Sequence, residues 1–172
     1  MKFLGSCAAA ILAGALLAAP STAGRELAPA ATYVDATGDS GDAPDITRVT
    51  IRPVGDGLAV DVRLARPTEL GPYGWILFGL DTDRNPFTGG GRGDELLVLT
   101  NGQSTTLARW IDGRFSTDFR HHDVEARYSG TDLTFTLARA DLRTRSFVFS
   151  VASLRQDADL APGFGVARYP RR

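Results

Sequence analysis

The chain alternates apolar and polar residues in one segment after another, and pairs of turn-forming residues separate the segments. Such alternation indicates a strand with one buried face, because successive side chains of a strand point to opposite sides of the sheet. It is clearest in residues 48–52, 58–64, 133–137 and 147–151. Four residue pairs that favour the positive φ angles of tight hairpins lie between apolar segments: Asp56-Gly57, Asn101-Gly102, Asp112-Gly113 and Ser129-Gly130.

Two further segments, residues 75–80 and 96–99, are apolar on both faces, which predicts central strands covered by layers on both sides. Only residues 137–142 could form a short helical turn. Eight or more strands with regular turns predict an all-β fold: a single antiparallel β-sandwich of the jelly-roll kind, spanning residues 32–169.

The first residues have the pattern of an export signal. Lys2 precedes an apolar stretch at residues 8–19, and the small-x-small sequence of residues 21–23 ends before Gly24. The apolar stretch is shorter than the roughly 20 residues of a membrane span, so it predicts a signal peptide at residues 1–23 and no stable membrane anchor. Cys7 lies before this stretch instead of at its end, which argues against lipidation. We expect a secreted protein, extracellular or periplasmic, with a flexible segment at residues 24–31.

Cleavage there removes the only cysteine and the only lysine of the chain. The 19 basic residues nearly balance the 20 acidic ones, which argues against nucleic acid as a partner. Without disulfides, stability must come from the core and from bound metal. We expect a monomer.

A glycine-rich acidic loop joins the two doubly apolar segments. Asp81, Asp83 and Asn85 are spaced so that in an extended chain they project to one side. Thr88 and Asp94, with Glu95 and the carbonyls of residues 89–91, could complete the six or more oxygen ligands that calcium takes.

The start of this loop is similar to an EF-hand loop, and the likeness then ends. Pro86 stands where that loop needs glycine, and Arg92 where it needs the bidentate glutamate. The alternative interpretation is a polar turn in which Asp and Asn cap backbone amides. Repulsion among clustered carboxylates favours the calcium site.

A second acidic group leads into the segment at residues 46–51, and a solvated loop and a second metal site are both open interpretations. Its members are Asp35, Asp39, Asp42 and Asp45.

Enzyme motifs are weak in this chain. Residues 38–41 spell the nucleophile motif of trypsin-like proteases, but no histidine precedes them to act as base. His121 and His122 are adjacent and would face opposite sides of a strand, which makes a poor zinc site. No pair of acids stands out as a glycosidase pair. We therefore expect no catalysis.

Several aromatic residues could stack on a sugar ring: Tyr73, Trp75, Trp110, Phe115, Phe119 and Tyr128. Trp110 lies beside the Asp112-Gly113 turn, so we expect it to be partly exposed and to contact a ligand.

Three motifs resemble bacterial secreted domains related to the family-nine carbohydrate-binding modules and the DOMON superfamily. They are Asp35-x-x-Gly38-Asp39 with Ala43-Pro44-Asp45-Ile46, Leu80-Asp81-Thr82-Asp83-Arg84-Asn85-x-x-Thr88-Gly89, and Asp159-Leu160-Ala161-Pro162-Gly163-x-Gly165. The resemblance implies a β-sandwich with Asp81, Asp83 and Asn85 as its acidic loop, and some members bind calcium, sugar or haem. We expect no haem, because residues 24–172 contain no methionine and the two histidines are adjacent.

The sequence thus favours a non-catalytic secreted binding or accessory module, stabilised by calcium, with an extracellular glycan as its ligand. The main alternative is a structural domain that binds a surface protein, and a hydrolase is a distant third.

Overall fold

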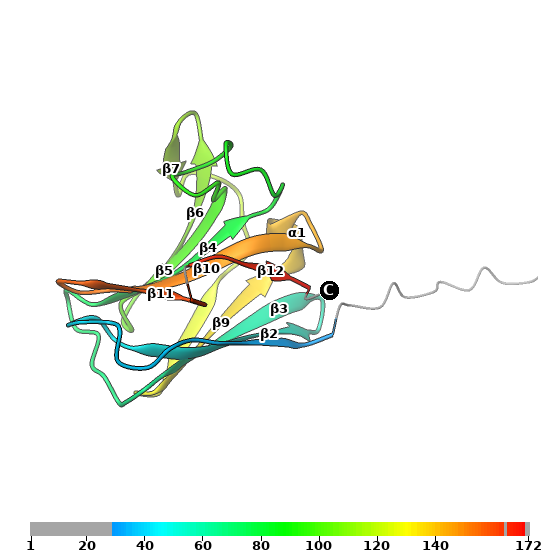
Figure 1. Cartoon of the computed structure of the whole chain (residues 1–172). Coiled ribbons are helices and arrows are strands. Elements are labelled where there is room, and N and C mark those ends of the chain that lie inside the picture. Colours follow the sequence, from blue (N-terminus) through cyan, green and yellow to red (C-terminus); the bar gives the residue numbers. More distant parts are fainter. Residues whose placement is uncertain (1–28, 164, 171–172) are drawn as a thin grey trace, which may run out of the picture.

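The structure of the protein is a computed structural model that describes residues 29–163 and 165–170. Strands make up 49% of it and helix 3%, and two antiparallel sheets pack face to face (Figure 1). The prediction of an all-β sandwich is confirmed.

The first sheet has five strands in the order β1-β2-β3-β9-β8. Their bounds are Ala31–Val34 (β1), Ile46–Val54 (β2), Gly57–Leu64 (β3), Asp132–Ala138 (β9) and Glu125–Tyr128 (β8).

The second sheet has seven strands in the order β11-β10-β4-β5-β6-β7, and β12 also pairs with β10. Their bounds are Ala158–Ala161 (β11), Phe147–Leu154 (β10), Trp75–Asp81 (β4), Leu96–Thr100 (β5), Thr105–Ile111 (β6), Arg114–Ser116 (β7) and Ala167–Tyr169 (β12). The chain passes between the sheets after β3, β7 and β9.

Alternation along the strands builds the core between the sheets. Phe78 of β4 and Phe135 of β9 are fully buried, and their rings stack across the interface with centroids 6.4 Å apart. Phe149 of β10 packs against Phe78 at 5.9 Å. These inward positions are the apolar ones of the two-residue pattern, which is why the pattern predicts the core.

The doubly apolar strands β4 and β5 are central in the second sheet, but the first sheet covers only one of their faces. On the outer face Leu77, Leu97 and Leu99 are half-buried. The expectation of covering layers on both sides is therefore wrong for this face of the described chain.

Hairpin turns follow the sequence with one exception. Asp112 and Gly113 have φ angles of 51° and 80°, as the Asp-Gly pair predicts. Between β2 and β3, however, the positive φ of 54° falls on Gly55, and Gly57 already belongs to β3. A Cβ at Gly57 would lie 2.3 Å from the Leu137 carbonyl oxygen, so this glycine permits close strand packing instead of forming the turn.

Short helix α1 (Arg139–Leu142) links β9 to β10, where the sequence allows one helical turn. Within the described residues no helix has the length and apolar character needed to cross a bilayer. The predicted signal peptide and most of the predicted flexible segment lie outside the described residues; its last residue, Ala31, opens β1.

Candidate metal centres

Three carboxylates meet where β4 ends and β5 begins. Oxygen atoms of Asp81, Asp83 and Glu95 lie within 4.8 Å of one another. We call these three residues the loop cluster. Asp81 is the last residue of β4 and only 3% exposed, whereas Asp83 is exposed and Glu95 half-buried.

Backbone geometry after β4 brings Asp81 and Asp83 together. Arg84 takes a positive φ of 63°, which turns the chain back. The Asn85 N–H then donates to Asp81 Oδ1 at 3.1 Å and to Asp83 Oδ1 at 2.8 Å. One backbone amide thus holds both carboxylates, as an Asx-type turn does.

Thr88 contacts the loop cluster directly. Its hydroxyl oxygen lies 2.9 Å from Asp83 Oδ2 and 3.1 Å from Glu95 Oε1. Asn85 instead turns its side-chain oxygen to the Phe87 N–H, at 3.1 Å. The structure thus places Thr88 within the predicted site, while the Asn85 side chain caps the turn.

Asp94 is not one of the three carboxylates that meet within 4.8 Å, and its neighbour Glu95 is. The Asp94 carboxylate lies over Gly79, where a Cβ would come within 2.8 Å of Oδ1. Glu95 Oε2 accepts hydrogen bonds from the Thr82 N–H at 2.6 Å and from its hydroxyl at 2.9 Å.

Burial controls the electrostatics of the loop cluster. Desolvation raises the pKa of Asp81, and the nearby charges of Glu95 and Asp83 raise it further. Burial likewise raises the pKa of Asp94; the charge of Arg92 opposes this effect, and the charges of Asp81 and Glu95 add to it. A bound cation would offset both effects, because it favours the charged carboxylates.

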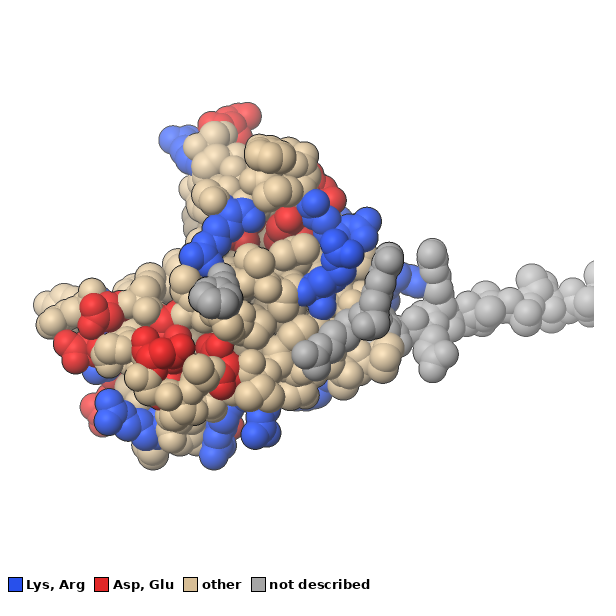
Figure 2. Space-filling view, viewed as in Figure 1, with Lys and Arg blue, Asp and Glu red and all other residues tan. Residues whose placement is uncertain are grey.

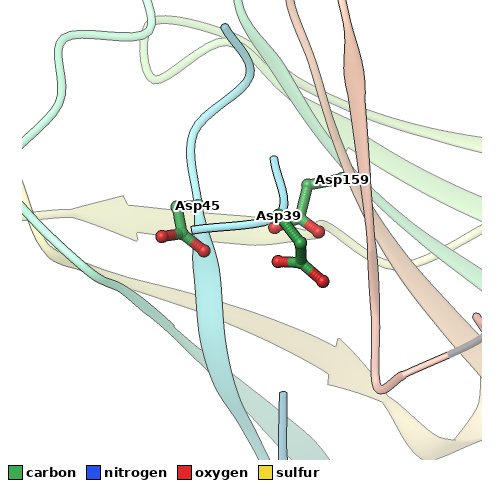
Figure 3. Close-up of side chains that lie close together, drawn as sticks. All are labelled: Asp39, Asp45 and Asp159. Carbon is green, nitrogen blue, oxygen red and sulfur yellow. The ribbon is translucent and has the colours of Figure 1, made fainter. Parts of the chain in front are cut away.

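A second group of carboxylates lies between the two sheets. Oxygen atoms of Asp39, Asp45 and Asp159 lie within 4.8 Å of one another (Figure 3). Asp39 comes from the loop after β1, Asp45 directly precedes β2, and Asp159 belongs to β11 of the other sheet. Asp35 is not one of the three that meet within this distance, but its charge acts on Asp159, and those of Asp39 and Asp45 act on it. We call these four residues together the inter-sheet cluster.

Hydrogen bonds between the sheets fix this arrangement. Asp159 Oδ2 accepts the Ile46 N–H at 2.6 Å, and the Ser153 hydroxyl of β10 donates to the Pro44 carbonyl. Asp35 Oδ1 accepts the Gly163 N–H, which ties the end of β1 to the turn after β11. Asp45 Oδ2 accepts the Gly38 N–H at 2.8 Å.

Three of the four residues in the second predicted group therefore belong to the inter-sheet cluster, and Asp42 does not. Asp42 is exposed and its N–H donates to Asp157 Oδ2 at 3.0 Å. Asp159 is the member that residue spacing missed. Asp159 lies in register with Ser153 and on the same face as buried Ala161, so an acid at an inward position of a short strand was the available signal.

The inter-sheet cluster concentrates negative charge. Desolvation raises the pKa of Asp159, and Asp35, Asp39 and Asp45 raise it further. Desolvation also raises the pKa of Asp35, again with Asp39 and Asp45 acting in the same direction. Ion pairs among the described residues join other acids: Arg52–Asp61, Arg63–Asp132, His122–Asp141 and Arg127–Glu125.

Trp110 is half-buried, and its ring meets Phe115 edge-on with centroids 5.1 Å apart. Phe115 in turn lies against Gly90 of the acidic loop. Tyr73 is far more open, at 81% exposure, and borders a hollow of about 540 Å³ with Glu69, Arg155 and Gln156.

The two histidines have separate partners. His122 Nδ1 lies 3.2 Å from buried Asp141, and His121 Nδ1 lies 2.7 Å from the His122 carbonyl. His121 also packs against Phe119 at 4.9 Å. His122 therefore anchors the segment before β8 to α1, while the contacts of His121 lie within that segment.

Comparisons of this chain with protein-family models, with characterised proteins and with solved structures return no match. The resemblance to carbohydrate-binding and DOMON domains therefore stays a prediction.

Proposed function

We propose that this protein is a non-catalytic binding or accessory module, exported from the cytoplasm and stabilised by calcium. The observation that carries the proposal is the convergence of Asp81, Asp83 and Glu95 at one strand end, with the Thr88 hydroxyl within hydrogen-bond distance of two of them. Carboxylate and hydroxyl oxygens on a flexible loop suit calcium, which accepts irregular sets of oxygen ligands.

Burial of Asp81 gives a further reason to expect an ion. A carboxylate with 3% exposure that lies near two further carboxylates is costly without a counter-charge. Calcium would supply that charge and join the end of β4 to the start of β5. The role is structural, and we assign no residue to catalysis.

The ligand class that we propose is carbohydrate. Tyr73 offers an open ring beside Glu69, Arg155 and Gln156, a combination of stacking and hydrogen-bonding groups that suits a pyranose. Trp110 remains the residue that the sequence predicts as a ligand contact.

A surface protein is the second candidate partner, and the outer face of the second sheet favours it. Leu77, Leu97 and Leu99 lie side by side on neighbouring strands and keep part of their apolar surface exposed.

Melting curves in calcium, magnesium and EGTA test the calcium proposal. Extracellular modules bind calcium with Kd values of roughly 0.1–1 mM, so about 1 mM ion at the loop should raise Tm by about 1–6 °C. Asp81→Asn keeps an oxygen for the Asn85 N–H but removes the charge. The variant should therefore lose the rise in Tm that calcium at the loop produces. Asp56→Asn, at an exposed turn, is the matched control. If calcium raises the Tm of Asp81→Asn as much as that of wild type, the loop cluster is not the calcium site.

A glycan array followed by calorimetry tests the ligand class. Tyr73→Ala should abolish glycan binding and leave Tm unchanged, because its ring is largely exposed. Trp110→Ala should weaken binding and lower Tm, because its ring also packs on Phe115. Absence of binding to every glycan would favour the surface-protein alternative.

A further inference from the structure

We propose that the inter-sheet cluster of Asp35, Asp39, Asp45 and Asp159 is a second divalent-cation site, which fastens the two sheets of the sandwich together. The chemical class of the ligand is a hard cation of the size of calcium. The inference goes beyond the proposed function, since it holds whether or not the loop cluster binds an ion.

The oxygens that have no hydrogen-bond partner point to a ligand. Asp35 is only 8% exposed, and its Oδ2 is fully buried without a partner, as is Oδ1 of Asp45. A buried carboxylate oxygen without a donor is costly, and nearly all buried polar atoms in folded proteins are paired. A cation between Asp39, Asp45 and Asp159 would satisfy the Asp45 oxygen, and its charge would offset that of buried Asp35, which acts on Asp159.

Backbone hydrogen bonds hold three of the carboxylates in place. One oxygen each of Asp35, Asp45 and Asp159 accepts a backbone N–H, from Gly163, Gly38 and Ile46 respectively. These bonds orient the carboxylates and leave their other oxygens for an ion. Asp39, which is exposed, lies between Asp45 and Asp159 and closes the group (Figure 3).

Charge leads to the same conclusion. Three carboxylates meet at the site and Asp35 adds a fourth charge nearby, and the charges that act on Asp35 and Asp159 are those of other members of the cluster. In the space-filling view, acidic side chains gather on this side of the molecule (Figure 2). A divalent ion would neutralise half of this charge.

The donor set favours calcium over magnesium. Carboxylates from the β1–β2 connection and from β11 cannot easily supply the strict octahedron at 2.0–2.1 Å that magnesium demands. Calcium accepts six to eight oxygens at 2.3–2.6 Å, water included. Higher ligand charge also tightens calcium binding. We therefore expect this site to bind calcium about tenfold more tightly than the loop cluster.

Because the cluster lies between the two sheets, an ion bound there would have a structural role. Asp35 and Asp45 flank the connection between two strands of the first sheet, and Asp159 lies in a strand of the second. An ion bound to all of them would close this end of the sandwich and add to the hydrogen bonds at Ile46, Pro44, Gly163 and Asp42.

Calcium titration calorimetry on the purified protein, with binding stoichiometry as the readout, tests the inference. Wild type should bind about two ions per chain, and Asp159→Asn about one. The asparagine keeps an acceptor for the Ile46 N–H, so the variant should fold. Asp157→Asn, two residues away in the turn before β11 but bonded to Asp42, is the matched control and should bind as wild type does.

Combining this variant with the loop variant separates the two sites. Asp81→Asn should keep the tighter ion, and Asp81→Asn/Asp159→Asn should bind none. If Asp159→Asn retains wild-type stoichiometry while Asp81→Asn loses an ion, the inference is wrong and the calcium loop stands. If only Asp159→Asn loses an ion, the inference stands and the loop proposal fails.

Folding is checked by the melting temperature in EGTA. Should Asp159→Asn melt well below wild type there, Asp39→Asn takes its place, because Asp39 is exposed and removing its charge disturbs little packing. Unchanged stoichiometry in a folded Asp39→Asn variant would overturn the inference.

Discussion

The loop cluster and the inter-sheet cluster contain the same chemical groups, but they differ in how their oxygens are satisfied. In the loop cluster, Asn85, Thr88 and Thr82 donate to the carboxylates, and all three lie within the same loop. In the inter-sheet cluster, two carboxylate oxygens are buried without a donor.

This difference shows what each cluster requires of an ion. The loop can hold its carboxylates with its own donors, so calcium adds to a turn that is already formed. The inter-sheet cluster has fewer donors than oxygens, so calcium would relieve repulsion and desolvation in the body of the fold. We therefore expect removal of calcium to affect the inter-sheet cluster more.

The largest effect should come from Asp159→Ala. This change removes the acceptor of the buried Ile46 N–H as well as a calcium ligand. Because the N–H is then unpaired, we expect the free energy of unfolding to fall by about 1–3 kcal/mol even in EGTA. Urea unfolding gives the value. Asp83→Ala, at an exposed member of the loop cluster, is the comparison and should lose less than half as much. If both variants lose the same free energy of unfolding, the two clusters do not differ in the way proposed.

Asp39→Asn should reverse the sign of its effect with calcium. In EGTA it relieves repulsion from Asp45 and Asp159, and we expect Tm to rise by about 2–4 °C. In calcium it lacks a ligand and should melt below wild type. The measurement is calorimetry of both proteins in both buffers. A variant less stable than wild type in EGTA would show that the Asp39 carboxylate stabilises the ion-free protein more than its repulsion destabilises it.

Thr88→Val addresses the loop cluster. The hydroxyl bridges Asp83 and Glu95 in an exposed setting, so its loss should cost about 0.5–1 kcal/mol in EGTA. Calcium should restore part of this, because the ion can hold the same two carboxylates. Thr47→Val is a control whose exposed hydroxyl donates to the carbonyl of Arg63, a residue of neither cluster, and its cost in unfolding free energy should not depend on calcium.

The sequence predicts the structural features that depend on residues close together in the chain. Asp112 and Gly113 form the expected turn because their conformations are set locally, and Asp81 and Asp83 meet because one turn joins them. Asp159 joins Asp39 and Asp45 only through the packing of two sheets, a contact across more than a hundred positions that residue spacing does not encode. Gly57 likewise serves the packing of β3 on β9 and not the adjacent turn.

The smallest effect should come from a carboxylate that already has a cationic partner. Asp132 pairs with Arg63 on the outer face of the first sheet, and hydrogen bonds from Arg63 and Thr131 lower its pKa. Because the pKa is lower in the folded state, this pair stabilises the protein above about pH 4 and loses its effect as the pH falls through the folded-state value. Asp132→Asn should therefore lower the urea midpoint slightly at pH 7 and not at all near pH 2, and EGTA should leave the difference unchanged at pH 7. A dependence on calcium as large as that of Asp39→Asn would mean that any lost carboxylate alters the calcium response, and the comparison between paired and unpaired acids would fail.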